Sequence, residues 1–218
     1  DMEITPEVKV TLLKDFYNRI RDDPAFSLVY GKDHYQRLLN EFPKVHRVLM
    51  SLKKEYREVI FEITKRMGDG MAEFIERDVV TVEDYDRYCF YVAGLVGIGL
   101  SNLFASSGLE SEKMGENETL STHMGLMLQK TNIVRDYLED IMEEPAPRMF
   151  WPKEIWGLYA EKLEDFKLES NRTDAVKCLN HLIVDVLRHV KFCFEYLEMI
   201  KTPSVFRFCA IPQVMAIA

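Results

Sequence analysis

A chain of 218 residues with 47% hydrophobic and 29% charged side chains can bury a substantial core, and no stretch looks like a linker, so we expect one domain over 1–218. The formal net charge of −8 argues against nucleic acid as a partner, and it means that local basic groups or metal ions would have to hold an anionic ligand. The longest apolar run, 90–100, is too short and too rich in glycine for a membrane span. The four cysteines lack C-x-x-C spacing, which favours buried free thiols.

The N-terminal third predicts a series of helices. A Thr-Pro-Glu start and an Asp-Asp-Pro end delimit a helix over 5–22, and a second is expected over 33–40. A long helix is expected over 43–77, where Gly68 and Gly70 interrupt the apolar pattern. Because a glycine inside a helix is costly, these two indicate a close approach by another backbone or a ligand, or else ordinary helix packing.

The next predicted helix, 81–106, begins with the spacing of a capping box. Ala93, Gly97 and Ser101 recur on one stripe of this helix, so another backbone can approach it closely. Tyr88 precedes the stripe. From its position alone, Tyr88 is more often a core residue whose hydroxyl is hydrogen-bonded.

The stretch 122–140, THMGLMLQKTNIVRDYLED, places polar side chains along one face of a predicted helix. Gln129, Asn132, Asp136 and Asp140 lie at i, i+3, i+7 and i+11. If this stripe is buried, its carboxylates need neutralising, and Mg²⁺ commonly uses one or two carboxylates while leaving positions for phosphates. The alternative is a solvated helix face, which the spacing alone favours.

Two basic residues of the same stretch, Lys130 and Arg135, are near enough in sequence to reach a phosphate. The opposite row of the helix is expected to face the core: Met127, Thr131, Val134, Leu138 and Ile141. Prolines at 145 and 147 should end the helix.

The C-terminal third predicts a helix from Pro152, a long amphipathic helix over 173–200 and a last helix from Pro203 that Pro212 should kink. His181 and His189 lack zinc-ligand spacing and are interpreted as structural or surface residues. The inward face of the long helix is expected to carry Val176, Leu179, Ile183, Val186, Leu187 and Val190. Because no segment shows sustained period-two alternation, we predict an all-α bundle.

Four stretches resemble squalene synthases, of the head-to-head prenyl synthase family. QKTNIVRDYLED is similar to the second aspartate-rich motif, and RMGDGMAEF, YCFYVAGLVGIGLSNLF and VFRFCAIPQVMAIA follow the family in the same order over essentially the whole chain. The resemblance implies a class I isoprenoid synthase-type helical bundle around a central cavity. It also implies Mg²⁺-dependent condensation of two farnesyl diphosphates to presqualene diphosphate, and NADPH-dependent reduction to squalene in sterol biosynthesis.

The resemblance also implies roles for individual residues. Asp136 and Asp140 match the metal ligands, Arg135 assists them, and Tyr88 matches a tyrosine that is assigned a proton-transfer role. No G-x-G-x-x-G follows a strand, so the nicotinamide cofactor must bind outside a Rossmann unit. The substrate-binding positions implied by the family are Met67, Met71, Val92, Val96, Leu100, Gln129, Asn132, Arg148, Phe206 and Phe208.

The family has two facing aspartate-rich motifs and a C-terminal membrane anchor. The chain begins with residues that resemble those just after the first motif and stops inside an apolar run, so we expect a fragment that binds metal weakly. The complete protein is expected to be a monomer at the endoplasmic reticulum membrane, with its catalytic domain facing the cytosol. Two alternatives stay open: a phytoene or dehydrosqualene synthase-type enzyme, and a non-catalytic relative that serves as an assembly or scaffold protein.

Overall fold

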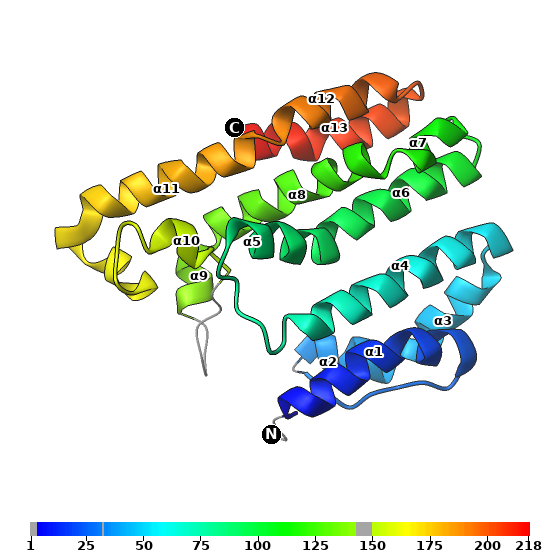
Figure 1. Cartoon of the computed structure of the whole chain (residues 1–218). Coiled ribbons are helices and arrows are strands. Elements are labelled where there is room, and N and C mark those ends of the chain that lie inside the picture. The colour runs from blue at the N-terminus through cyan, green and yellow to red at the C-terminus, as the bar shows by residue number, and fades with distance from the viewer. Residues whose placement is uncertain (1–3, 32, 143–149) are drawn as a thin grey trace. The chain divides into compact units, whose positions relative to one another are not determined.

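Helices form all the regular structure that the computed structural model describes, in residues 4–31, 33–142 and 150–218, which confirms the all-α prediction (Figure 1). The chain divides into two compact units, Asp1–Glu76 and Arg77–Ala218. All four cysteines are buried and free, as expected.

The first unit contains four helices: α1 Pro6–Asp22, α2 Asp33–Asn40, α3 Phe42–Ser51 and α4 Lys54–Glu73. Helix α1 packs along α4. At Gly68 a Cβ atom would lie 2.4 Å from the Leu13 carbonyl oxygen, so this glycine permits the close backbone approach that its position indicated. The single helix predicted over 43–77 is wrong, because Leu52 and Lys53 are extended and separate α3 from α4.

The second unit contains the remaining elements: α5 Val82–Cys89, the π-helical turn η1 Phe90–Gly94, α6 Leu95–Ser106, α7 Glu112–Glu116, α8 Glu118–Arg135, α9 Tyr137–Ile141, α10 Lys153–Trp156, the 3₁₀ turns η2 Leu163–Lys167 and η3 Glu169–Asn171, α11 Arg172–Leu187, α12 Val190–Met199 and α13 Pro203–Ile217. Helix α8 lies between the α5–α6 run and helices α11 to α13 (Figure 1). It packs against elements on both sides and is the centre of this unit.

The α5–α6 run confirms two sequence predictions. Thr81 and Asp84 form the capping box at its start. A Cβ at Gly97 would lie 2.2 Å from the Ser121 carbonyl oxygen of α8, so the backbones of α6 and α8 approach closely at this glycine.

The helical run Val82–Ser106 extends beyond the apolar residues 90–100 at both ends. By length and composition it is the one helix of the described residues that could cross a membrane. Core helices of soluble proteins can also be this long and apolar, and the Val82–Ser106 run packs against α8.

The helix predicted over 122–140 is interrupted. Helix α8 ends at Arg135, Asp136 has φ −88° and ψ 10°, and α9 starts at Tyr137. The Tyr137 hydroxyl donates a hydrogen bond to the Leu163 carbonyl oxygen at 2.7 Å, and these tertiary contacts fix α9. Leu138, which was expected to face the core, is consequently 63% exposed.

The helix predicted over 173–200 is two helices, α11 and α12, separated at Arg188 and His189. Val186 is buried, as predicted, but the rest of the inward face differs: Val176, Ile183 and Leu187 are exposed, and Cys178 and Leu182 are buried instead. The physical reason is Asp185, which turns inward to pair with the buried Lys130 of α8. The helix predicted from Pro152 is only the four residues of α10.

Candidate functional site

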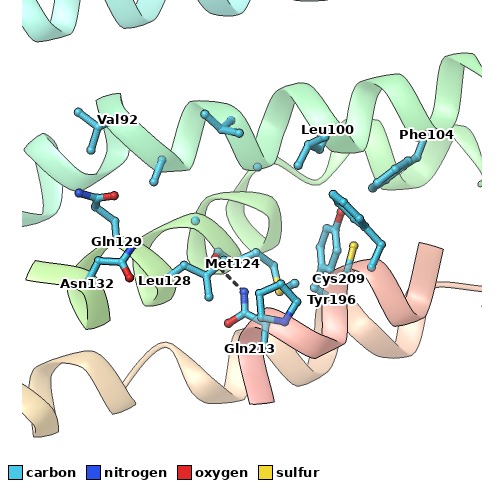
Figure 2. A pocket seen from close by; sticks show the side chains of 16 residues that line it. Val92, Leu100, Phe104, Met124, Leu128, Gln129, Asn132, Tyr196, Cys209 and Gln213 are labelled. Carbon is cyan, nitrogen blue, oxygen red and sulfur yellow. Dashed lines mark hydrogen bonds between the residues drawn. The ribbon is translucent and has the colours of Figure 1, made fainter. Parts of the chain in front are cut away.

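A cavity of about 270 Å³ lies in the second unit, between the η1–α6 run, α8, α12 and α13 (Figure 2). Its walls are mostly hydrocarbon and bare backbone. The lining residues are Val92, Ala93, Val96, Gly97, Leu100, Phe104, Met124, Gly125, Leu128, Gln129, Asn132, Tyr196, Phe208, Cys209, Pro212 and Gln213.

Helical periodicity explains how the α6 wall forms. Val92, Val96 and Leu100 recur every four residues, so their side chains stack along one face, and all three line the cavity. On the facing helix, Gly125 lets α8 approach, since a Cβ there would lie 2.3 Å from the Ala93 carbonyl oxygen. The cavity is therefore bounded by two backbones in contact and by the side chains that diverge from them.

The two phenylalanines predicted to bind substrate, Phe206 and Phe208, point to different sides of α13. Phe208 lines the cavity and makes an edge-to-face contact with Phe104, with 6.2 Å between the ring centroids. Phe206 is 43% exposed and is not part of the lining. Two residues two positions apart on a helix point about 200° apart, so they cannot both face one wall.

The polar stripe lies at one end of the cavity. Figure 2 shows Gln129 and Asn132 together there, beside Val92. Asp136 follows Asn132 by one turn, and its backbone N–H donates to the Asn132 carbonyl oxygen at 2.8 Å. The Asp140 N–H in turn donates to the Asp136 carbonyl oxygen at 2.9 Å. The break at Asp136 thus preserves the succession of polar residues from the cavity to the two acids.

Arg135 neutralises one of these acids. Its Nε and Nη2 atoms donate to the two carboxylate oxygens of Asp136 at 2.7 and 3.2 Å. Among residues 4–31, 33–142 and 150–218, no cluster of three or more His, Cys, Asp or Glu side chains could hold a metal ion. A pair of carboxylates is nevertheless a suitable donor set for Mg²⁺, which retains several waters and takes phosphate oxygens for its other positions.

Lys130 does not reach a phosphate, and that expectation is wrong. Its side chain is fully buried, with Nζ 2.5 Å from Asp86 Oδ1 and 2.5 Å from Asp185 Oδ2. Arg188 pairs with both of these acids. Lys130 shares its face of α8 with the buried Leu126 and Ile133, which is a signal in the sequence that its charge points into the protein.

Tyr88 is half-buried on α5, and its ring stacks on Phe150 with 4.6 Å between the centroids. Asp86, two residues earlier on the same helix, forms an ion pair with Lys130 that joins α5 to α8. Met67 and Met71 lie on α4 in the first unit, and their role stays a prediction. Arg148 lies outside the described residues.

Two polar groups of the lining, on Tyr196 and Gln213, were not predicted from the sequence. The Tyr196 hydroxyl lies 2.7 Å from Ser101 Oγ, and burial raises the pKa of Tyr196 to about 12. Gln213 is buried and donates from Nε2 to the Met124 carbonyl oxygen at 2.9 Å. A lone amide in the apolar sequence of α13 was the only signal for Gln213.

Comparison with known proteins places the chain in a family. The squalene/phytoene synthase family model matches residues 1–218. Squalene synthase BSS of Botryococcus braunii is 54% identical over 218 residues, which cover 99% of this chain and 47% of that protein. Squalene synthase 1 of Arabidopsis thaliana is 52% identical over 219 residues, covering 100% and 52%.

A solved structure, TcSQS in complex with the ligand BPH1237, is 47% identical with a TM-score of 0.96, and the match covers 100% of this chain and 64% of that one. This match confirms the predicted helical isoprenoid synthase fold. The chain spans about half the length of the curated relatives it matches. With a family model that spans it from end to end and relatives more than half identical to it, the chain belongs to the squalene/phytoene synthase family.

Proposed function

We propose that the protein is a squalene synthase, which joins two farnesyl diphosphates head to head to form presqualene diphosphate and reduces that intermediate to squalene with NADPH. The observation that carries the proposal is the apolar cavity, whose polar end at Gln129 and Asn132 continues along the chain to Asp136 and Asp140. This arrangement suits an amphiphile with a long hydrocarbon chain and an anionic head.

The acids and the basic residue of the stripe have complementary roles in this proposal. Asp136 and Asp140 would hold Mg²⁺, which when bound neutralises the charge of a departing diphosphate. Arg135 carries a positive charge beside Asp136 and adds to that neutralisation. Gln129 and Asn132 offer amide donors where the hydrocarbon cavity meets the acids.

The cavity walls serve a second requirement. Loss of diphosphate from an allylic carbon leaves a carbocation, which water would quench. Most of the wall consists of Val, Leu and Phe side chains, which carry no polar atom that could attract water to the cation. We assign Tyr88 to the proton that is lost when the cyclopropane ring of presqualene diphosphate closes. NADPH supplies the hydride of the second step.

The proposal includes the whole chain and its cellular setting. One family model spans both compact units, which supports a single catalytic core over 1–218. By resemblance to the family, we propose a monomer at the endoplasmic reticulum membrane whose catalytic part faces the cytosol.

The test is a product assay with labelled farnesyl diphosphate and Mg²⁺, with and without NADPH. Squalene with NADPH, and presqualene diphosphate without it, is the expected result. Asp136→Asn and Asp140→Asn should each lower turnover by at least ~100-fold, because each removes a charge that the leaving group requires. Glu112→Gln is the matched control, since it removes an exposed acid of α7, outside the aspartate-rich motif, and should leave turnover unchanged.

Other outcomes identify the alternatives. Dehydrosqualene formed from farnesyl diphosphate without any response to NADPH indicates a dehydrosqualene synthase-type enzyme, and phytoene formed only when labelled geranylgeranyl diphosphate is supplied indicates a phytoene synthase-type enzyme. An absence of Mg²⁺-dependent turnover, with both Asn variants indistinguishable from wild type in every assay, contradicts the enzyme and leaves a scaffold protein.

A further inference from the structure

Helices α2 and α3 of the first unit carry apolar side chains on their exposed faces. None of the eight residues of α2 is buried, and His46 is the buried residue of α3. Tyr35 and Leu38 of α2 are 65% and 51% exposed, and Val45 and Val48 of α3 are 40% and 64% exposed. The members of each pair are three residues apart, so their side chains lie on the same face of their helix.

The two pairs belong to one surface. Leu38 and Val45 both border a hollow of about 270 Å³ between the two helices. Glu41 lies in the same hollow, where its carboxylate oxygens are 2.6 Å from Lys44 Nζ and 3.5 Å from Arg37 Nε. The acid is therefore neutralised by its neighbours. We call the four exposed apolar side chains, together with the basic residues of 37–54, the α2–α3 surface.

The α2–α3 surface is positively charged in a protein that is otherwise acidic. Residues 33–54 contain five lysine and arginine residues against two aspartate and glutamate residues, a net charge of +3. The whole chain has a net charge of −8, so the other residues carry −11. Arg47, Lys53 and Lys54 are all exposed. Positive charge and exposed apolar side chains thus occur together on the same pair of helices.

The surface of an anionic membrane fits this combination. Helices that lie in a membrane interface bury a short apolar face at the acyl boundary, while lysine and arginine beside that face contact lipid phosphates. Tyr35 suits the boundary, because a tyrosine ring is apolar and its hydroxyl is polar. Anionic lipid would repel the remaining residues with their charge of −11, which favours the orientation in which the α2–α3 surface faces the membrane.

We propose that the α2–α3 surface binds the surface of a membrane that contains anionic phospholipids. Its four apolar side chains enter the interface, and its basic residues contact the lipid phosphates. The inference goes beyond the proposed reaction, because it involves neither the cavity nor the acids that follow α8. Since the apolar area is small and the charges are exposed, the binding is reversible and weakens with salt.

The test is co-sedimentation of the full chain with vesicles of equimolar phosphatidylcholine and phosphatidylserine, and with vesicles of phosphatidylcholine alone. The wild type should bind the anionic vesicles at least ~10-fold more tightly at low salt, and added salt should reduce this difference. Val48→Ser removes an apolar contact and Arg47→Gln removes a charge. Each should weaken binding to the anionic vesicles by ~3-fold or more.

Val184→Ser and Arg172→Gln are the matched controls. Val184 is 66% exposed, against 64% for Val48, and both valines lie on helices. Arg172 is an exposed base of the second unit, so its replacement changes the net charge of the protein as Arg47→Gln does. Both controls should bind anionic vesicles as the wild type does, and circular dichroism should show the same helix content in all four variants.

Three results would overturn the proposal. Equal binding to the two kinds of vesicle would remove the role of the charge. Equal weakening by each variant and its control would show a general effect of polarity or net charge rather than a surface. A dimer that Val48→Ser dissociates, without binding to vesicles, would assign the surface to a second copy of the chain. Because the readout is lipid binding, failure here leaves the proposed reaction standing, and failure of the product assay leaves this result standing.

Discussion

Replacing Lys130 with Met tests whether the buried ion pairs of this residue stabilise the fold. Lys130 is fully buried and forms ion pairs with Asp86 and Asp185, each at 2.5 Å. Arg188 completes a neutral group of two acids and two bases, with its Nε 3.0 Å from Asp185 Oδ1. The substitution keeps most of the side-chain volume and leaves two carboxylates facing one cation.

The size of the effect follows from exposure. Removing one partner of a buried ion pair costs about 3–5 kcal/mol of unfolding free energy. The Asp185 side chain is 9% exposed and cannot regain water, whereas that of Asp86 is 32% exposed and can do so in part. We therefore expect a loss at the lower end of that range, ~3 kcal/mol, measured by urea unfolding at pH 7.

The control is the double variant Lys130→Met with Asp185→Asn, which leaves Asp86 paired with Arg188. Because it restores neutrality, it should be more stable than Lys130→Met alone, and the two substitutions should be strongly non-additive. A single variant that loses less than ~1 kcal/mol, or a double variant whose losses simply add, would refute a structural ion group.

Two further predictions concern the same unit. Gly97→Ala should lower the unfolding free energy by ~1–3 kcal/mol, because the added Cβ would lie 2.2 Å from the Ser121 carbonyl oxygen. Gly94→Ala is the control and should cost much less, because the nearest atom to its added Cβ belongs to the Phe90 side chain. Equal losses in the two variants would contradict the close backbone approach at Gly97. His189→Gln should reduce the loss of stability on acidification. Burial, and then the charges of Lys130 and Arg188, lower the pKa of His189 to about 3, against about 6.5 in the unfolded chain. The contribution of neutral His189 to the unfolding free energy is therefore complete above pH 6.5 and is lost progressively as the pH falls towards 3. At pH 5 the unfolding free energy of the wild type should be ~2 kcal/mol lower than at neutral pH. An equally steep pH dependence in the variant would rule out His189 as the origin.

The parts of the fold that local chemistry determines were predictable from the sequence. The capping box at Thr81, the helix over 33–40 and the close approach at Gly97 each depend on residues within a turn or on the absence of a side chain. The breaks at Leu52 and Asp136 were not, because the apolar periodicity continues across both and tertiary contacts decide where each helix stops.

The face of α11 shows why periodicity alone was insufficient. Val176 and Ile183 have the spacing of an inward row, but so do Cys178 and Leu182, and apolarity does not distinguish the two. Asp185 decides between them, because pairing with Lys130 stabilises the orientation that a hydrophobic pattern would reject. A polar residue can thus decide which face of a helix is buried, and the local sequence does not show its partner, which lies on another helix.

The candidate site divides in the same way. The spacing of Gln129 and Asn132 predicted a polar seam, and the structure places both at the cavity. The chemistry of Asp136 and Asp140 came from the family resemblance, since the same spacing suits an exposed helix face. Neither spacing nor the resemblance predicted that Gln213 lines the cavity, because its position is fixed by a hydrogen bond to the Met124 carbonyl oxygen, 89 residues away in the chain.

The two basic residues Lys130 and Arg135 of α8 have different surroundings. Lys130 is neutralised inside the protein by two acids, so the group as a whole contributes little net field to its surroundings. Arg135, beyond the next turn, is exposed and has only Asp136 as its described ion-pair partner, which leaves it able to respond to a bound anion. The two positive charges of α8 therefore act on different partners: Lys130 stabilises the packing of α8 against α5 and α11, and Arg135 lies beside Asp136 at the polar end of the stripe.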